Sequence, residues 1–409
     1  PRIALLQARG RVHGLGAGAS ASSTMAGAAR ELTRATLPAL WLSPREIVAP
    51  AYGQRVFIAS AAALNDLGRA NSSSTQASRV VSALILGAMR GVAGDAISLA
   101  ASGDHRLRGA RHEMVEGDHA ASAGRPEAAV HAYAAAWTAA FRALTRYVAS
   151  RAVTVPASDV SAAAKTALGS RKIRLAGPRI LASGPELRRA GKPELFFVGS
   201  EACPFCAVER WGMIVALSQF GTFSDLRLMQ SDTQHQPAIR SFTFAGSRYR
   251  SRYIAFVPVE AFSNVHKGFG YAPLQPLTGP QQALVRRFDP QTQVPFVDVD
   301  NRYVKVDSTV QPTLLAEMSW TGVVQSLTRP GSLAAQAVSG EAEVFTAEVC
   351  AVTGGRPRSV CSRPIVAQYR AALPLLDGKG GGCPTSSPPS AAERRGGQHP
   401  RAWPARCIV

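Results

Sequence analysis

A short stretch in the middle of the chain, residues 194–220, constrains the fold more than any other. It reads ELFFVGSEACPFCAVERWGMIVALSQF: an apolar run typical of a buried strand, a short turn, two cysteines separated by two residues, and an amphipathic helical pattern. The order predicts that Cys203 and Cys206 lie at the N-terminus of a helix, with Pro204 at its first position, where a missing N–H has no helical partner to lose. The free N–H groups and the dipole at this end stabilise a thiolate, so the spacing predicts a redox-active dithiol.

A strand–CxxC–helix order is typical of thioredoxin-like redox sites, in which Cys203 would form the mixed disulfide with a substrate and Cys206 would resolve it. Such sites place a cis-proline opposite the dithiol, and Pro295, just ahead of the predicted hairpin FVDVDNRYVKV, has that position. We therefore take Cys203, Cys206 and Pro295 as the candidate catalytic residues. Two other readings stay open: the cysteines form a structural disulfide or half of a zinc site, and Pro295 is an ordinary trans proline.

A second cysteine pair follows in the C-terminal half of the chain. Cys350 and Cys361 flank the loop AVTGGRPRSV, and a disulfide that closes a loop of this order stabilises a fold by about 3 kcal/mol in the chain-entropy model. The spacing favours a structural disulfide. The alternative is a zinc site that joins all four cysteines, although such sites usually use two closely spaced pairs. Cys383 and Cys407, near the C-terminus, have no comparable context.

The chain has 409 residues, enough for more than one domain. We expect an α/β fold class: a thioredoxin-like domain with a central mixed sheet and flanking helices, preceded by a mainly helical, partly disordered N-terminal region. Within the α/β domain, the strand at 195–199 is expected to pair in parallel with the strand at 225–230, because a helix connects them. The predicted segments are an Ala/Arg-rich, partly disordered region (1–101), a helical hairpin (102–150), a linker (151–191), the thioredoxin-like domain (192–376) and a disordered tail (377–409).

The net charge of +19 does not predict a nucleic-acid partner. Only six of the 46 basic residues are lysines, and the arginines are scattered, with no basic run interleaved with aromatic residues. The longest apolar run, Val80–Met89, is far shorter than the roughly 20 residues of a membrane helix, so we expect no membrane span in this chain. Residues 1–40 lack a basic-then-apolar signal pattern, although a leader or an anchor ahead of Pro1 is compatible with the sequence.

Several motifs together resemble one known family. The segments FFVGSEACPFCAVERWGMIVALSQFGTFSDLRLMQS and FTFAGSRYRSRYIAFVPVE, followed by VPFVDVDNRYV and EVCAVTGGRPRSVC, are similar to the thioredoxin-like family catalogued as domain of unknown function 929, over roughly residues 180–376. The resemblance implies a thioredoxin-like fold and a dithiol role, in bacterial and archaeal proteins that are often exported or membrane-anchored. The family's dithiol, its strand-preceding proline and its loop cysteines correspond here to Cys203 and Cys206, Pro295, and Cys350 and Cys361.

These features predict an extracytoplasmic thiol–disulfide oxidoreductase that exchanges disulfides with protein thiols and relies on an unidentified electron-transfer partner. An even number of cysteines, all after position 202, is compatible with an oxidising compartment. The alternative is a non-catalytic binding or scaffold protein in which the helical hairpin docks a partner and the cysteines are structural. A third reading is a small metal-binding module. We predict no cofactor, and no phosphate loop or Ser/His/Asp arrangement supports nucleotide or hydrolytic chemistry.

Overall fold

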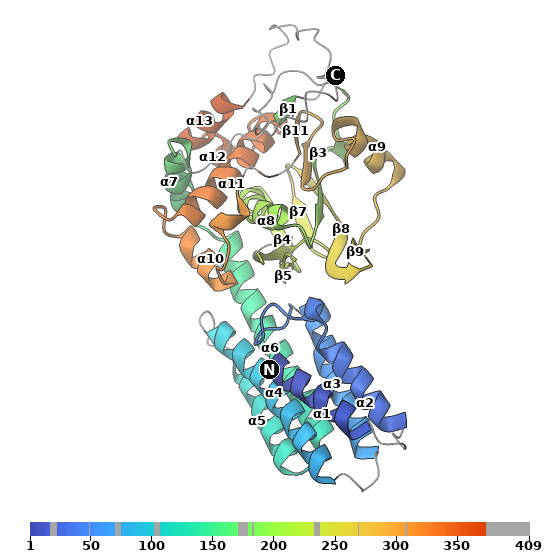
Figure 1. Cartoon of the computed structure of the whole chain (residues 1–409). Helices are drawn as coiled ribbons and strands as arrows, with labels where there is room; N and C mark the ends of the chain where they lie inside the picture. The colour runs from blue at the N-terminus through green and yellow to red at the C-terminus, as the bar shows by residue number, and fades with distance from the viewer. Residues whose placement is uncertain are drawn as a thin grey trace, which may run out of the picture.

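The structure, a computed structural model, contains a helical group and an α/β group of elements. Figure 1 shows the N-terminal helices, coloured blue to cyan, gathered in one group, and the strands with the C-terminal helices gathered in the other. The α/β fold class and the helical N-terminal region predicted from the sequence are confirmed. The structure describes residues 1–16, 23–48, 50–69, 75–101, 107–170, 179–181, 184–232, 238–268, 270–306, 308 and 310–373.

Helices make up most of the described N-terminal region. They are α1 (Arg2–Gly16), α2 (Ser23–Ala35), η1 (Pro38–Leu40), α3 (Pro50–Arg69), α4 (Thr75–Ala101), α5 (Arg108–Ser122), α6 (Pro126–Val153) and α7 (Ala157–Leu168). The described part of the region 1–101 is mostly helical, and partial disorder within this region stays a prediction. Many of its buried positions are alanines, such as Ala28 and Ala35 beside Leu32 on α2. Alanine favours helices but is only weakly apolar, so it blurs the periodicity by which an amphipathic helix is recognised.

Helices α5 and α6 occupy the region expected to hold a helical hairpin, and they approach each other closely. Pro126 is the first residue of α6, where its missing N–H removes no helical hydrogen bond. Gly117 on α5 faces the ring of Tyr133 on α6, and a Cβ atom on Gly117 would lie 2.4 Å from a ring carbon. The hydroxyl of Tyr133 donates to Asp118 at 2.8 Å. The close approach of the two helices is therefore the reason why residue 117 is a glycine.

Helix α4 is the one helix in the described part of the chain whose length and composition would allow it to cross a membrane. Its segment Gln76–Ala101 has a mean hydropathy of 1.6 over the most apolar window. In the structure α4 packs against α1, α3, α5 and α6. The core helix of a soluble protein can have the same length and composition, so α4 is not evidence for a membrane span. The absence of a membrane span stays a prediction.

The main sheet of the described residues has seven strands in the order β1-β11-β10-β3-β8-β9, with β2 paired to β3. Its strands are β1 (Arg179–Leu181), β2 (Arg188–Arg189), β3 (Lys192–Ser200), β8 (Ala255–Lys267), β9 (Gly270–Pro273), β10 (Phe296–Val299) and β11 (Tyr303–Val306). The strand that leads into the dithiol, β3, lies between β8, to which it is parallel, and β10, to which it is antiparallel. Two small sheets pair β4 (Gly221–Ser224) with β7 (Arg248–Ser251) and β5 (Arg227–Gln230) with β6 (Arg240–Thr243).

The parallel partner of β3 differs from the prediction. The strand expected at 225–230 is β5, which pairs with β6 in a separate small sheet. The partner of β3 is β8, reached by a longer connection that contains helix α8 (Pro204–Leu217). The physical reason is length: β5 has four residues, whereas the thirteen residues of β8 can pair with β3 from Glu194 to Ser200.

Helices cover both faces of β3. Because alternate residues of a strand point to opposite faces, Leu195 and Phe197 join the larger core with α8 and α11 (Leu333–Val352). Phe196 and Val198 join a smaller core with α9 (Gly279–Phe288). The other C-terminal helices are η2 (Pro312–Leu314), α10 (Trp320–Leu327), α12 (Arg358–Cys361) and α13 (Pro364–Ala372). The dithiol therefore begins at the end of a strand that is buried on both sides.

A row of aromatic side chains joins the helical group to the α/β group. Phe57 on α3, Trp137 and Phe141 on α6, and Trp320 on α10 have successive ring-centroid distances of 5.8, 4.8 and 6.2 Å. Helix α6 extends from the helical group towards α8 and α10 (Figure 1). The two groups therefore share a continuous apolar core.

Helix α7 lies within the stretch predicted as a linker, yet it packs on the α/β group. It contacts α11 and α13, beside which it is drawn in Figure 1. The hydroxyl of Tyr369 on α13 donates to the carbonyl oxygen of Ala164 on α7 at 2.9 Å. Apolar positions of α7, including Val160 and Ala167, are buried in the larger core.

Candidate active site

The predicted cysteine pair lies at the N-terminus of α8, where β3 ends. Cys203 is the N-cap residue, Pro204 is the first helical residue, and Cys206 lies within the first turn. The sulfur of Cys203 accepts a hydrogen bond from the backbone N–H of Cys206 at 3.2 Å. Neither cysteine is in a disulfide. Because the strand, the turn and the helix follow one another directly, the sulfur of Cys203 lies next to N–H groups of the first helical turn that have no partner within the helix.

The two sulfurs have different surroundings. Cys203 is half-buried, whereas Cys206 is completely buried. The hydrogen bond from the Cys206 thiol, helped by backbone N–H groups and by the charge of Arg210, lowers the pKa of Cys203. Burial raises the pKa of Cys206 well above its ordinary value, and the neighbouring Cys203 raises it further. The pair is thus divided into a half-buried cysteine whose pKa is lowered and a fully buried cysteine whose pKa is raised.

The predicted proline lies beside the dithiol, although it is far away in the sequence. The peptide bond between Val294 and Pro295 is cis, and β10 begins at the next residue. The thiol of Cys203 donates to the carbonyl oxygen of Val294 at 3.5 Å. The contact to Cys203 is therefore made by the backbone of the residue before Pro295. The antiparallel pairing of β10 with β3 brings the two segments together.

A buried ion pair next to the dithiol was not predicted from the sequence. Arg210 on α8 donates to both carboxylate oxygens of Glu260 on β8, with Nε–Oε1 and Nη2–Oε2 distances of 2.8 and 2.6 Å. Neither side chain has any exposed surface. Burial alone would lower the pKa of Arg210, but the Glu260 carboxylate outweighs it and raises that pKa, so the guanidinium stays charged. The available signal was a pair of charged residues, Glu209 and Arg210, in an otherwise apolar helix.

A polar cluster lies on another side of the dithiol turn. The backbone N–H of Asp232 donates to the carbonyl oxygen of Ala202 at 2.9 Å. The carboxylate of Asp232 contacts Nε2 of His266 at 3.0 Å and accepts a hydrogen bond from the hydroxyl of Tyr271 at 2.8 Å. Burial and Asp232 raise the pKa of Tyr271, and Cys203 contributes to the same rise. The cluster therefore presents a neutral phenol and a partly exposed imidazole close to the dithiol.

The carboxyl group of Glu201, two residues before Cys203, is also buried. Burial raises its pKa, against the effect of a hydrogen bond from Thr243. The backbone N–H of Glu201 donates to the carbonyl oxygen of Phe262 on β8 at 2.8 Å. Glu201 thus belongs to the buried base of the turn rather than to its exposed rim.

A second group of buried charges joins Glu209, the residue before Arg210 on α8, to β11 and α11. Nζ of Lys305 on β11 is 2.7 Å from Oε1 of Glu209 and also donates to Glu341 on α11. Ser308 donates to the other oxygen of Glu209 at 2.8 Å. All three charged side chains are at most 1% exposed. Burial raises the pKa of Glu209 to about 7. These contacts tie α8 to β11 and α11, and so hold the helix that carries the dithiol.

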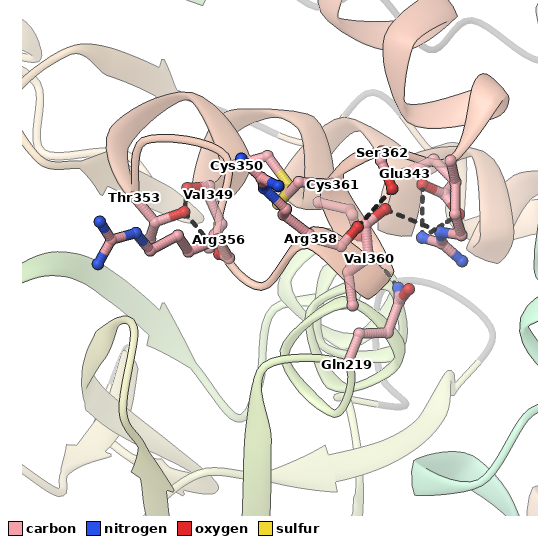
Figure 2. The surroundings of a disulfide bond; sticks show 12 residues. Gln219, Glu343, Val349, Cys350, Thr353, Arg356, Arg358, Val360, Cys361 and Ser362 are labelled. Atoms are coloured by element: carbon pink, nitrogen blue, oxygen red, sulfur yellow. Dashed lines mark hydrogen bonds and ion pairs between the residues drawn. A yellow bond between two sulfur atoms is a disulfide. The ribbon is translucent and has the colours of Figure 1, made fainter.

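Cys350 and Cys361 form a disulfide in the structure. Figure 2 shows Cys350 on α11 bonded to Cys361 on α12, across a loop of which Thr353 and Arg356 are labelled. The hydroxyl of Thr353 donates to the carbonyl oxygen of Arg356 at 2.8 Å and so closes the loop from inside. The zinc site considered as an alternative would have needed these two cysteines as ligands.

Within the described ranges, no group of three or more His, Cys, Asp or Glu side chains could hold a metal ion. Cys383, Cys407 and the predicted disordered tail lie outside the described residues.

Comparison with known proteins gives one match. The family model described as Domain of unknown function (DUF929) matches residues 180–267. No curated protein and no solved structure is similar enough to count as a match. The matched range contains the dithiol, Arg210 and Glu260, and it ends before Val294. The chain therefore contains a domain of unknown function 929 over residues 180–267, and the candidate active site lies mainly within it.

Proposed function

We propose that the protein is a thiol–disulfide oxidoreductase with a thioredoxin-like domain, acting through Cys203 and Cys206 on the thiols and disulfides of other proteins. One observation carries the proposal: a half-buried cysteine with a lowered pKa lies on a helix N-terminus beside a fully buried cysteine with a raised pKa. This division is what the two steps of thiol–disulfide exchange require, because the attacking and resolving groups differ.

The reaction with a substrate disulfide has two steps. The thiolate of Cys203 attacks one substrate sulfur, the substrate S–S bond breaks, and the other substrate sulfur leaves as a thiolate that takes up a proton. Cys206 then loses its proton and attacks the sulfur of Cys203, which releases the second substrate thiolate and leaves a Cys203–Cys206 disulfide. The substrate gains the two electrons that the cysteine pair loses. The same steps in reverse oxidise a substrate dithiol.

The topology around the dithiol supports a thioredoxin-like arrangement. The parallel pair β3–β8 is connected through α8, and the antiparallel hairpin β10–β11 follows on the other side of β3. The Val294 carbonyl, 3.5 Å from the Cys203 sulfur, is a backbone acceptor that an extended substrate segment could use. The Cys350–Cys361 disulfide supports an extracytoplasmic location, because disulfides persist in oxidising compartments.

The test is a redox titration of the full chain against glutathione, with thiol alkylation read residue by residue by mass spectrometry. We expect Cys203 and Cys206 to titrate together, Cys203 to alkylate first, and Cys350–Cys361 to stay closed. In Cys206→Ser, a mixed disulfide with glutathione should accumulate on Cys203, whereas Cys203→Ser should form none on Cys206.

The opposite result has a defined meaning. A cysteine pair that resists alkylation and exchange under conditions where the chain stays folded would contradict the proposal. The non-catalytic binding or scaffold protein would then be the better reading.

A further inference from the structure

The buried guanidinium of Arg210 is connected to both cysteines through Ser200, the last residue of β3. The carbonyl oxygen of Ser200 accepts from Nη2 of Arg210 at 2.8 Å and from the backbone N–H of Cys203 at 3.2 Å. The backbone of Ser200 also hydrogen-bonds the sulfur of Cys206. Arg210 follows Cys206 by four residues, so the two side chains lie on one side of α8. The cation is therefore part of the immediate surroundings of both sulfurs.

Packing alone does not account for a cation at this position. A buried ion pair is often no more stabilising than apolar side chains of similar volume, because both charges lose their hydration. The neighbours of Arg210 one turn away on α8, Ala207 and Ile214, are buried and apolar, so an apolar residue would suit this face of the helix if Glu260 were replaced as well. A negative charge that forms nearby during the reaction would account for a buried cation at position 210. Cys203 is such a group, because it reacts as a thiolate.

We propose that Arg210, held in place by Glu260, is a positioning residue of the dithiol whose positive charge stabilises the thiolate of Cys203. This inference rests on the proposed function, since it concerns the reacting state of the same cysteine pair. It agrees with the electrostatics: after the hydrogen bond from Cys206, the charge of Arg210 is among the causes that lower the pKa of Cys203. Glu260 fixes the guanidinium through two hydrogen bonds and partly offsets its charge.

The test measures the rate of Cys203 alkylation against pH in the reduced full chain, with mass spectrometry to separate Cys203 from Cys206. Arg210→Met removes the cation and should raise the pKa of Cys203 by about one unit or more, which means about tenfold less thiolate near neutral pH. Glu260→Gln leaves the cation without its counterion and should lower the pKa of Cys203. Arg210→Lys keeps the charge and should stay closer to the wild type than Arg210→Met does.

Other titratable groups surround the dithiol, and none of them is replaced in these variants. They are Glu201, Asp232, His266 and Tyr271. Glu260 raises and Arg210 lowers the pKa of Glu201, so a shift in the pKa of Cys203 between the variants reports on Arg210 and Glu260 together with the response of Glu201.

Two further variants separate charge from folding. Arg210→Met combined with Glu260→Leu removes both charges at similar volume, so it is expected to fold even where Arg210→Met does not, and it should keep the raised pKa of Cys203. Arg363→Met is the matched control: it breaks another ion pair with a buried carboxylate, Arg363 Nη2 to Glu343 Oε1 at 3.0 Å, and should leave the pKa of Cys203 unchanged.

Each outcome decides between the two proposals. The role of Arg210 would be overturned if the pKa of Cys203 shifted in the same direction in Arg210→Met and Glu260→Gln, or did not shift in either. Opposite shifts are expected from the two charges, whereas a loss of packing gives no reason for them. Glutathione exchange by the wild type is measured in parallel. If the wild type does not exchange with glutathione, the proposed function is overturned. If it exchanges normally and the pKa of Cys203 is unchanged in the variants, only the role of Arg210 is overturned.

Discussion

Replacing Lys305 by methionine tests how strongly buried charge stabilises the position of α8. Lys305 is 1% exposed, and its ammonium group contacts the carboxylates of Glu209 and Glu341 from two different helices. Methionine keeps most of the side-chain volume but leaves two buried carboxylates without their cation. Breaking a buried pair in this way costs about 3–5 kcal/mol. We therefore expect Lys305→Met to lower the free energy of unfolding by about 4 kcal/mol near pH 8.

The cost should depend on pH, because a buried carboxyl group can lose its charge by taking up a proton. Burial already raises the pKa of Glu209 from its ordinary value of 4.5 to about 7, and Lys305 opposes this rise. A carboxyl group whose pKa is raised on folding stabilises the fold fully below its unfolded pKa, and this stabilisation is lost as pH rises through the folded pKa. For wild-type Glu209 the change is on the order of 3 kcal/mol between these two values. Without Lys305 the pKa rises further, so the penalty should shrink towards about pH 5.

Urea denaturation at about pH 5 and about pH 8, followed by far-UV circular dichroism, measures both effects. Arg34→Met, which breaks the surface pair with Glu31, is the control and should cost less than about 1 kcal/mol at either pH. Adding Glu209→Gln and Glu341→Gln to Lys305→Met should recover much of the loss. A loss below about 1 kcal/mol at the higher pH, or an equal loss at both, would refute the reasoning.

Two further predictions concern stability. The double variant Cys350→Ser, Cys361→Ser should lower the free energy of unfolding by about 3 kcal/mol, because their disulfide closes a loop with a sequence separation of 11; an equal midpoint of urea denaturation for wild type and variant would contradict this. Gly117→Ala should destabilise the protein by about 1–3 kcal/mol, because the new Cβ would lie 2.4 Å from the ring of Tyr133. Gly109→Ala on the same helix meets nothing within 4 Å and should be neutral or stabilising in thermal denaturation, and a reversed order would count against the packing argument.

The features that could be predicted from the sequence are those encoded over short distances. The apolar run before Cys203, the proline after it and the helical pattern beyond it each point to the same local geometry, and the fold class followed from them. The pairing of β3 with β8 could not be predicted in the same way, because several strand-like segments follow α8 and only strand length in the folded sheet distinguishes them.

One part of the candidate site escaped prediction for a similar reason. The pairing of Arg210 with Glu260 joins residues 50 positions apart, and the burial of an arginine is a property of the folded core rather than of a local pattern. The Val294 carbonyl, by contrast, lies 91 residues from Cys203 and reaches it because Pro295, the proline expected opposite the dithiol, follows it in a cis peptide bond.

The packing of α7 has a consequence for where the dithiol-bearing unit begins. The match to the domain of unknown function 929 starts at residue 180, but α7 (Ala157–Leu168) lies before it in the chain and covers α11 and α13. A fragment that began at residue 180 would expose to water the apolar faces that Val160 and Ala167 cover, and it would deprive the Tyr369 hydroxyl of its acceptor. If the dithiol-bearing unit is transferred to another protein, whether by evolution or by engineering, α7 has to be included with the sheet.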